Sequence, residues 1–88
     1  MKEYEFVIEV LKDDGSIVKG GEFKSDQRLF NERDLNELTK DLDKKRVLVR
    51  LKYDTRAAYV FHEFCECWVY EPIESAINTI KRQIWLEK

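Results

Sequence analysis

The sequence predicts an α+β fold: a two-layer arrangement in which a four-stranded antiparallel sheet carries both helices on one face, in the order ββαββα. Two kinds of periodicity lead to this fold. Some segments alternate apolar and polar side chains, which is typical of half-buried strands, and others repeat leucine or isoleucine at the helical spacing of three and four. The 88 residues fit a single domain, residues 1–88.

The first half is expected to begin with a β-hairpin. Residues 3–10 alternate apolar and acidic side chains with a period of two. Residues 13–16, with the sequence DDGS, supply typical turn chemistry. The second strand, residues 17–24, contains Gly20 and Gly21, which predict a bend or a bulge.

A helix is expected to follow this hairpin. Leu29 and Phe30 should fold back onto the core just before it. Asn31 can accept from the free amides of the first turn, and Asp34 three residues later can complete a capping box. We expect the helix to run to residue 45. Its apolar face is marked by three leucines, Leu35, Leu38 and Leu42.

The second half should begin with a strand over residues 46–53, in a segment, residues 44–56, that is rich in basic side chains. A basic row on one sheet face can grip phosphates, and nearby aromatic rings can stack on bases. The candidate binding residues are Arg46, Arg50, Lys52, Arg56, Tyr59 and Phe61. We favour the competing interpretation, in which acids on neighbouring strands pair with this row, because the net charge of the chain is −2.

Residues 57–70 form the most apolar segment and fit two structures. His62, Glu63 and Glu66 share one face if the segment is helical, which would give the alternative order ββαβαα. We prefer a strand, because Tyr, Val, Phe, Cys and Trp suit a pleated surface better. A turn just before this segment would then place Val60 opposite Leu51.

The same segment holds His62, Cys65 and Cys67, residue types that bind zinc. They are weak candidates for a metal site, because on a strand the cysteines share a face that His62 does not, and no Cys-x2-Cys turn is present. We expect the cysteines to be buried packing residues. No set of nucleophile, base and orienting acid can be named. We therefore expect no metal, no cofactor and no enzymatic activity.

The last helix should start at Pro72, since a proline is favourable at a first helical position. Its isoleucines recur at spacings of four, three and four, namely Ile73, Ile77, Ile80 and Ile84. We expect this row to pack on the sheet, because a domain of this size needs that surface for its own core. The alternative use is to pair with a second copy in a homodimer.

Charge and length limit the function. The chain has 16 Lys and Arg against 18 Asp and Glu, which gives no strong field for nucleic acid. It has neither a signal peptide nor an apolar segment long enough to cross a membrane, so we expect a cytoplasmic protein with no membrane partner. The expected function is a small regulatory or inhibitory protein that binds another protein through an open sheet face or an edge strand. Its size fits a phage or mobile-element product. The alternative function is nucleic-acid binding through residues 44–56.

Overall fold

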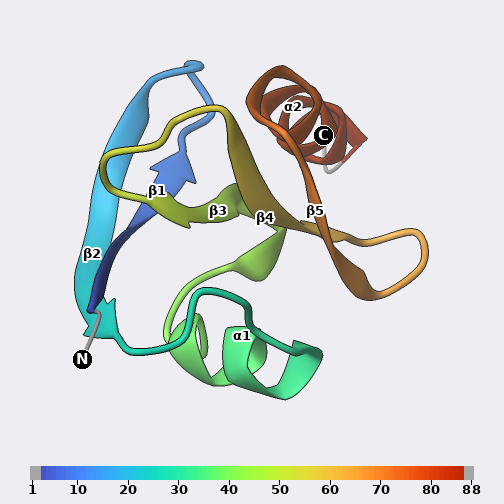
Figure 1. Ribbon diagram of the computed structural model, residues 1–88. Coiled ribbons are helices and arrows are strands. Elements are labelled where there is room, and N and C mark those ends of the chain that lie inside the picture. Colours follow the sequence, from blue (N-terminus) through green and yellow to red (C-terminus); the bar gives the residue numbers. More distant parts are fainter. Residues whose placement is uncertain (1–2, 87–88) are drawn as a thin grey trace.

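The computed structural model describes residues 3–86, which form a five-stranded antiparallel sheet and two α-helices (Figure 1). The strands lie in the order β2-β1-β3-β4-β5 across the sheet. The elements are β1 (Tyr4–Leu11), β2 (Ile17–Ser25), α1 (Glu32–Leu38), the 3₁₀ turn η1 (Lys44–Arg46), β3 (Val47–Leu51), β4 (Ala57–His62), β5 (Cys67–Pro72) and α2 (Ile73–Leu86). No helix within the described range is long and apolar enough to span a membrane.

The two helices cover opposite faces of the sheet. One buried cluster joins Leu35 of α1 to Val49 of β3, while the other joins Ile80 of α2 to Leu48 of the same strand. Neighbouring residues of a strand point to opposite faces. The prediction of two layers with both helices on one face is therefore wrong. β3 and β4 are buried on both faces, so each face needs a covering helix.

A fifth strand arises because the apolar residues 57–70 divide into two strands. β4 and β5 pair from Ala57 opposite Pro72 to His62 opposite Cys67. Between them the chain reverses, and Glu66 takes a left-handed backbone conformation with a φ of 53°. The prediction of four strands and the helical alternative for residues 57–70 are both wrong.

The pairing of β3 with β4 also differs from the prediction. Val60 lies opposite Leu48, three positions before the expected Leu51. The link between these strands, residues 52–56, is longer than the tight turn that we expected. An odd shift of this kind moves every side chain of a strand to the other sheet face relative to its neighbour.

The bulge predicted in the second strand is confirmed at Gly20. Ile8 pairs with Gly21 and Glu9 pairs with Lys19, so Gly20 has no partner of its own. A Cβ atom on Gly20 would lie 3.0 Å from Cγ2 of Val10. Only glycine lets the two strands approach this closely without displacing a core side chain.

Helix α1 begins as predicted but ends earlier. The capping box is confirmed, with Asn31 accepting from the Asp34 amide and Asp34 accepting from the Asn31 amide. The helix stops at Leu38 instead of continuing to residue 45. Buried Thr39 follows as C-cap, and its hydroxyl donates to the Leu35 carbonyl oxygen at 2.8 Å. The chain then turns, which brings Leu42 back onto the core.

Helix α2 follows Pro72 directly and packs on the second sheet face. Ala76, Ile80 and Ile84 are buried against β3 and β4, as the isoleucine spacing predicts. A buried glutamine, Gln83, adds a polar bridge. Its amide donates to the carbonyl oxygen of Lys45 at 2.9 Å, and its oxygen accepts from the Glu63 amide at 2.7 Å.

Candidate functional site

The four basic side chains predicted to bind phosphates each have an acidic partner. The N–O distances are 2.5 Å for Arg46 and Asp13, 2.6 Å for Arg50 and Glu9, 3.1 Å for Lys52 and Glu22, and 3.0 Å for Arg56 and Asp54. Three of the four acids belong to the hairpin of β1 and β2. The basic row is thus neutralised across the sheet, as the competing interpretation expects.

The ion pair between Lys52 and Glu22 shifts the pKa values of both side chains. Hydrogen bonds from Lys19 and then Lys52 lower the pKa of Glu22. The hydrogen bond to Glu22 in turn raises the pKa of Lys52. Both shifts favour the charged forms, so the ion pairs on this surface stay ionised at neutral pH.

The two aromatic candidates lie on the opposite sheet face from the basic row. Tyr59 and Phe61 belong to the cluster that includes α1, whereas Arg50 alternates with Val49 of that cluster and points the other way. The Tyr59 hydroxyl accepts from the Phe30 amide at 3.2 Å, and Phe61 packs edge-on against Trp68. The sheet therefore separates the rings from Arg50, whereas Lys44 of the same basic segment lies over the Phe61 ring, with Nζ 4.3 Å from the ring centroid.

The pair formed by Asp54 and Arg56 closes the link between β3 and β4. The Arg56 side chain donates to both carboxylate oxygens at 3.0 Å, and its backbone amide donates to one of them at 3.1 Å. These hydrogen bonds lower the pKa of Asp54 to about 2. Because the folded value lies below the unfolded one, the stabilisation is present above pH ~4 and is lost as the pH falls through ~2.

We expect the Asp54 carboxyl to titrate with a pKa of about 2 when it is followed by NMR. Arg56→Gln should move this pKa upward toward the ordinary value of about 3.9, because the charged donor is lost. Arg33→Gln removes the same charge from the exposed side of α1 and should leave the Asp54 pKa unchanged. An ordinary Asp54 pKa in the unmodified protein would contradict the pairing.

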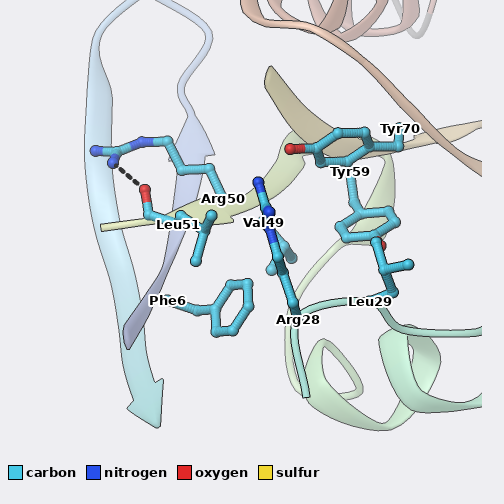
Figure 2. Close-up of a pocket in the computed structure, with 8 residues that line it drawn as sticks. All are labelled: Phe6, Arg28, Leu29, Val49, Arg50, Leu51, Tyr59 and Tyr70. Atoms are coloured by element: carbon cyan, nitrogen blue, oxygen red, sulfur yellow. Dashed lines mark hydrogen bonds between the residues drawn. The ribbon is translucent and has the colours of Figure 1, made fainter. Parts of the chain in front are cut away.

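An apolar hollow of about 150 Å³ opens on the sheet face that carries α1 (Figure 2). Its floor comes from side chains of β1 and β3, and its walls come from tyrosines of β4 and β5 and from the segment before α1. In Figure 2 the Arg28 side chain extends between Leu51 and the two tyrosines. The lining residues are Phe6, Arg28, Leu29, Val49, Leu51, Tyr59 and Tyr70, together with Arg50, whose guanidinium turns away to pair with Glu9.

A line of aromatic rings runs beside this hollow, and three of them, Phe6, Tyr59 and Tyr70, line it. Ring centroids follow one another at 5.1, 5.0, 6.3 and 4.8 Å across the sheet. The rings are those of Phe23, Phe6, Phe30, Tyr59 and Tyr70. Stacked and edge-to-face rings of this kind pack tightly, so the wall of the hollow is formed before any ligand arrives.

The rim of the hollow is both apolar and open. Leu29 is 71% exposed and Tyr70 is 49% exposed. Phe30 packs on the core as expected, whereas Leu29 turns outward, so the prediction that Leu29 folds back on the core is wrong. Within residues 3–86, neither the Arg28 guanidinium nor the Tyr70 hydroxyl makes a hydrogen bond or an ion pair. The rim thus offers apolar surface together with the Arg28 guanidinium and the Tyr70 hydroxyl, which interact with Asp54 and Arg56 only through longer-range electrostatics.

The sequence analysis did not mark Arg28, Leu29 or Tyr70 as binding residues. Arg28 and Leu29 stand in a polar stretch between β2 and α1 with no periodicity of its own. Tyr70 is one of several aromatics in an apolar run. The apolar pair Leu29 and Phe30 within this otherwise polar stretch is the one signal that could have marked the site.

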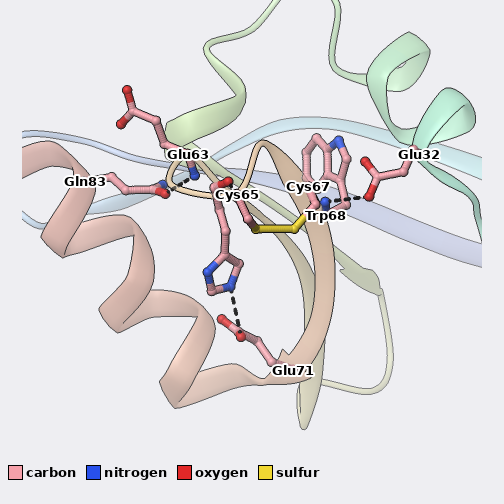
Figure 3. The surroundings of a disulfide bond; sticks show 8 residues. Glu32, Glu63, Cys65, Cys67, Trp68, Glu71 and Gln83 are labelled. Atoms are coloured by element: carbon pink, nitrogen blue, oxygen red, sulfur yellow. Dashed lines mark hydrogen bonds and ion pairs between the residues drawn. A yellow bond between two sulfur atoms is a disulfide. The ribbon is translucent and has the colours of Figure 1, made fainter.

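The weak metal candidates lie at the tip of the hairpin formed by β4 and β5 (Figure 3). Cys65 and Cys67 are joined in a disulfide, and Cys65 is exposed. The expectation that both cysteines are buried packing residues is therefore wrong. His62 Nε2 forms a hydrogen bond with a Glu71 carboxylate oxygen at 3.1 Å. In the part of the chain that the structure describes, no three His, Cys, Asp or Glu side chains are grouped to hold a metal.

Hydrogen bonds from both helices hold the base of this hairpin tip. Gln83 of α2 accepts from the Glu63 amide at 2.7 Å, and Glu32 of α1 accepts from the Trp68 amide at 2.8 Å (Figure 3). The Trp68 indole N–H also donates to Asn36 at 2.9 Å. Phe64 projects from the held tip as a fully exposed ring.

Comparisons with protein-family models, with curated proteins and with solved structures found no match for this chain. The residues and their geometry therefore supply the functional evidence.

Proposed function

We propose that this is a small regulatory or inhibitory protein that acts by binding another protein through the apolar hollow beside α1. The observation that carries the proposal is the pairing of a preformed aromatic wall with an exposed apolar rim, Leu29 and Tyr70. Interfaces draw most of their binding free energy from a few aromatic or apolar anchors that fill such pockets.

The size and charge of the hollow indicate what enters it. A volume of about 150 Å³ matches a cavity that holds one benzene-sized ring, so the hollow fits a single aromatic or branched apolar side chain. Arg28 lines the hollow and makes no close ion pair in the described chain, and its charge acts at longer range on Asp54, whose pKa it helps to lower. Complementary charge therefore favours an acidic residue next to the partner's apolar anchor.

The ion pairs of the basic row disfavour the alternative function, nucleic-acid binding through residues 44–56. Each phosphate that contacted Arg50 or Lys52 would have to displace a carboxylate already bound at 2.6 or 3.1 Å. The net charge of −2 provides no long-range attraction that would offset this exchange. We also propose binding without catalysis, because the cysteines beside His62, which would be the candidate nucleophiles, are cross-linked.

The proposal is tested with Leu29→Asp, which places a charge on the rim of the hollow. The immobilised protein is used to capture its partner from the native host, and the affinity is then measured with the purified partner. We expect Leu29→Asp to weaken binding at least about tenfold, because an apolar anchor contact is lost. The fold should be unchanged, since Leu29 is 71% exposed.

Leu86→Asp is the matched control, because Leu86 is 78% exposed on α2, on the other side of the sheet. It should leave the affinity unchanged. If Leu29→Asp binds the partner as tightly as the unmodified protein, the hollow is not the interface. If an oligonucleotide binds with a steep dependence on salt and Lys52→Glu abolishes this binding, the nucleic-acid alternative replaces the proposal.

A further inference from the structure

We propose that Cys65 and Cys67 form a reversible dithiol–disulfide site that exchanges electrons with small thiols of the glutathione class. This inference does not depend on the partner-binding proposal, because it concerns the hairpin tip between β4 and β5 and not the hollow. It rests on the position of the disulfide, on the backbone between the two cysteines and on the contacts that hold the tip in place.

The disulfide lies where a thiol can reach it. Strand pairing ends at His62 and Cys67, so Cys65 belongs to the turn and is exposed. Thiol–disulfide exchange requires a thiolate to attack a sulfur atom directly, and access to that sulfur helps to set the rate. The sulfur of Cys65 is therefore the expected point of attack (Figure 3).

The turn itself places the two sulfurs within bonding reach. Glu66, the residue between the cysteines, has a left-handed backbone with a φ of 53°. The Cα atoms of Cys65 and Cys67 lie 5.4 Å apart, within the range that disulfides require. In an extended strand, alternate residues also point to the same side but lie farther apart. The reduced pair is therefore preorganised to close again.

The fold around the tip does not depend on the disulfide. The bridge closes over one residue, so it removes little entropy from the unfolded chain. Gln83 accepts from the Glu63 amide just after the end of β4, and Glu32 accepts from the Trp68 amide in β5. Reduction should therefore change the tip locally and leave the domain folded.

The exchange proceeds in two steps. A thiolate attacks the sulfur of Cys65, the sulfur–sulfur bond breaks, and Cys67 leaves as a thiolate while Cys65 carries a mixed disulfide. A second thiolate then attacks the sulfur of the small thiol in this mixed disulfide and releases Cys65 as a thiolate. Two small thiols are oxidised to one disulfide, their two protons end on the two cysteines, and the protein disulfide gains two electrons.

The full chain is equilibrated in buffers that range from reduced to oxidised glutathione, quenched with acid and alkylated. Intact mass then gives the fraction that carries two alkyl groups. We expect this fraction to change reversibly from none to all across the series, with circular dichroism unchanged throughout. A pair that stays oxidised or stays reduced over the whole series would overturn the proposal, and so would reduction that unfolds the domain.

Two substitutions of Glu66 test the preorganised turn. Valine disfavours a left-handed backbone, so Glu66→Val should shift the equilibrium toward the dithiol by about fivefold or more. Asparagine tolerates that backbone and removes the same charge, so Glu66→Asn should keep the equilibrium of the unmodified protein. Equal equilibria for the two variants would contradict the role assigned to the turn.

Discussion

Trp68→Ala is expected to lower the free energy of unfolding by about 3–5 kcal/mol. Trp68 is 8% exposed, packs edge-on against Phe61 with ring centroids 5.5 Å apart, and joins β5 to α1 through its bond to Asn36. Its removal leaves a cavity and breaks the hydrogen bond that ties β5 to Asn36 of α1. Domains have total stabilities of about 0.05–0.15 kcal/mol per residue, which gives about 4–13 kcal/mol for an 88-residue chain, so the loss is a large fraction of the total.

Urea unfolding measures this effect. It is followed by far-UV circular dichroism and not by tryptophan fluorescence, because the variant lacks one of the two tryptophans. Trp85→Ala is the matched control, because Trp85 is 70% exposed on α2. It should change the unfolding free energy by no more than about 0.5 kcal/mol. Similar losses for the two variants would show that Trp68 does not join β5 to α1 as described.

Ile80→Ala is expected to cost about 2–5 kcal/mol of unfolding free energy. Ile80 is 1% exposed and lies in the cluster that packs α2 against Leu48 and Val60. The truncation removes buried methyl groups from the second sheet face, where α2 supplies the cover. The same urea titration measures the loss.

Ile17→Ala makes the same chemical change at a surface position of β2 and serves as the control. It should destabilise the protein far less than Ile80→Ala, because Ile17 buries less apolar area. If Ile80→Ala were as mild as Ile17→Ala, α2 would not form a core with the sheet, and the assignment of one helix to each face would fail.

The elements with local signals were predicted well. The hairpin of β1 and β2 is marked by alternation and by turn residues, and the bulge at Gly20 follows from a glycine that no side chain could replace. Asn31 and Asp34 form the capping box that their spacing predicts. The isoleucine row of α2 lies on the core as its period requires. Each of these features depends on residues close together in the chain.

The errors come from features that depend on distant contacts. The turn between β4 and β5 contains no glycine, proline or asparagine, and Glu66 adopts the left-handed conformation in their place. Nothing in the local pattern marks this reversal. The assignment of one helix to each face depends on β3 and β4 being buried on both faces, which alternation on a single strand does not reveal.

The grouping of basic and aromatic candidates failed for a related reason. With Val60 opposite Leu51, Tyr59 would share a face with Lys52; with Val60 opposite Leu48, it shares a face with Val49. The length of the link between β3 and β4, residues 52–56, sets this register, and that link is longer than its turn residues suggest. The apolar hollow, which we propose as the binding site in place of the basic row, is lined by residues of β1, β3, β4, β5 and the segment before α1. Only the tertiary fold brings these segments together.

A charge reversal at the hollow tests the central claim most directly. Arg28→Glu and Arg33→Glu change the net charge equally, but only Arg28 lines the hollow, whereas Arg33 lies exposed on α1. With the purified partner, the proposed interface predicts that Arg28→Glu raises the dissociation constant about tenfold or more. It predicts that Arg33→Glu leaves the dissociation constant unchanged. Equal dissociation constants for the two variants would contradict the claim that this hollow is where the protein binds.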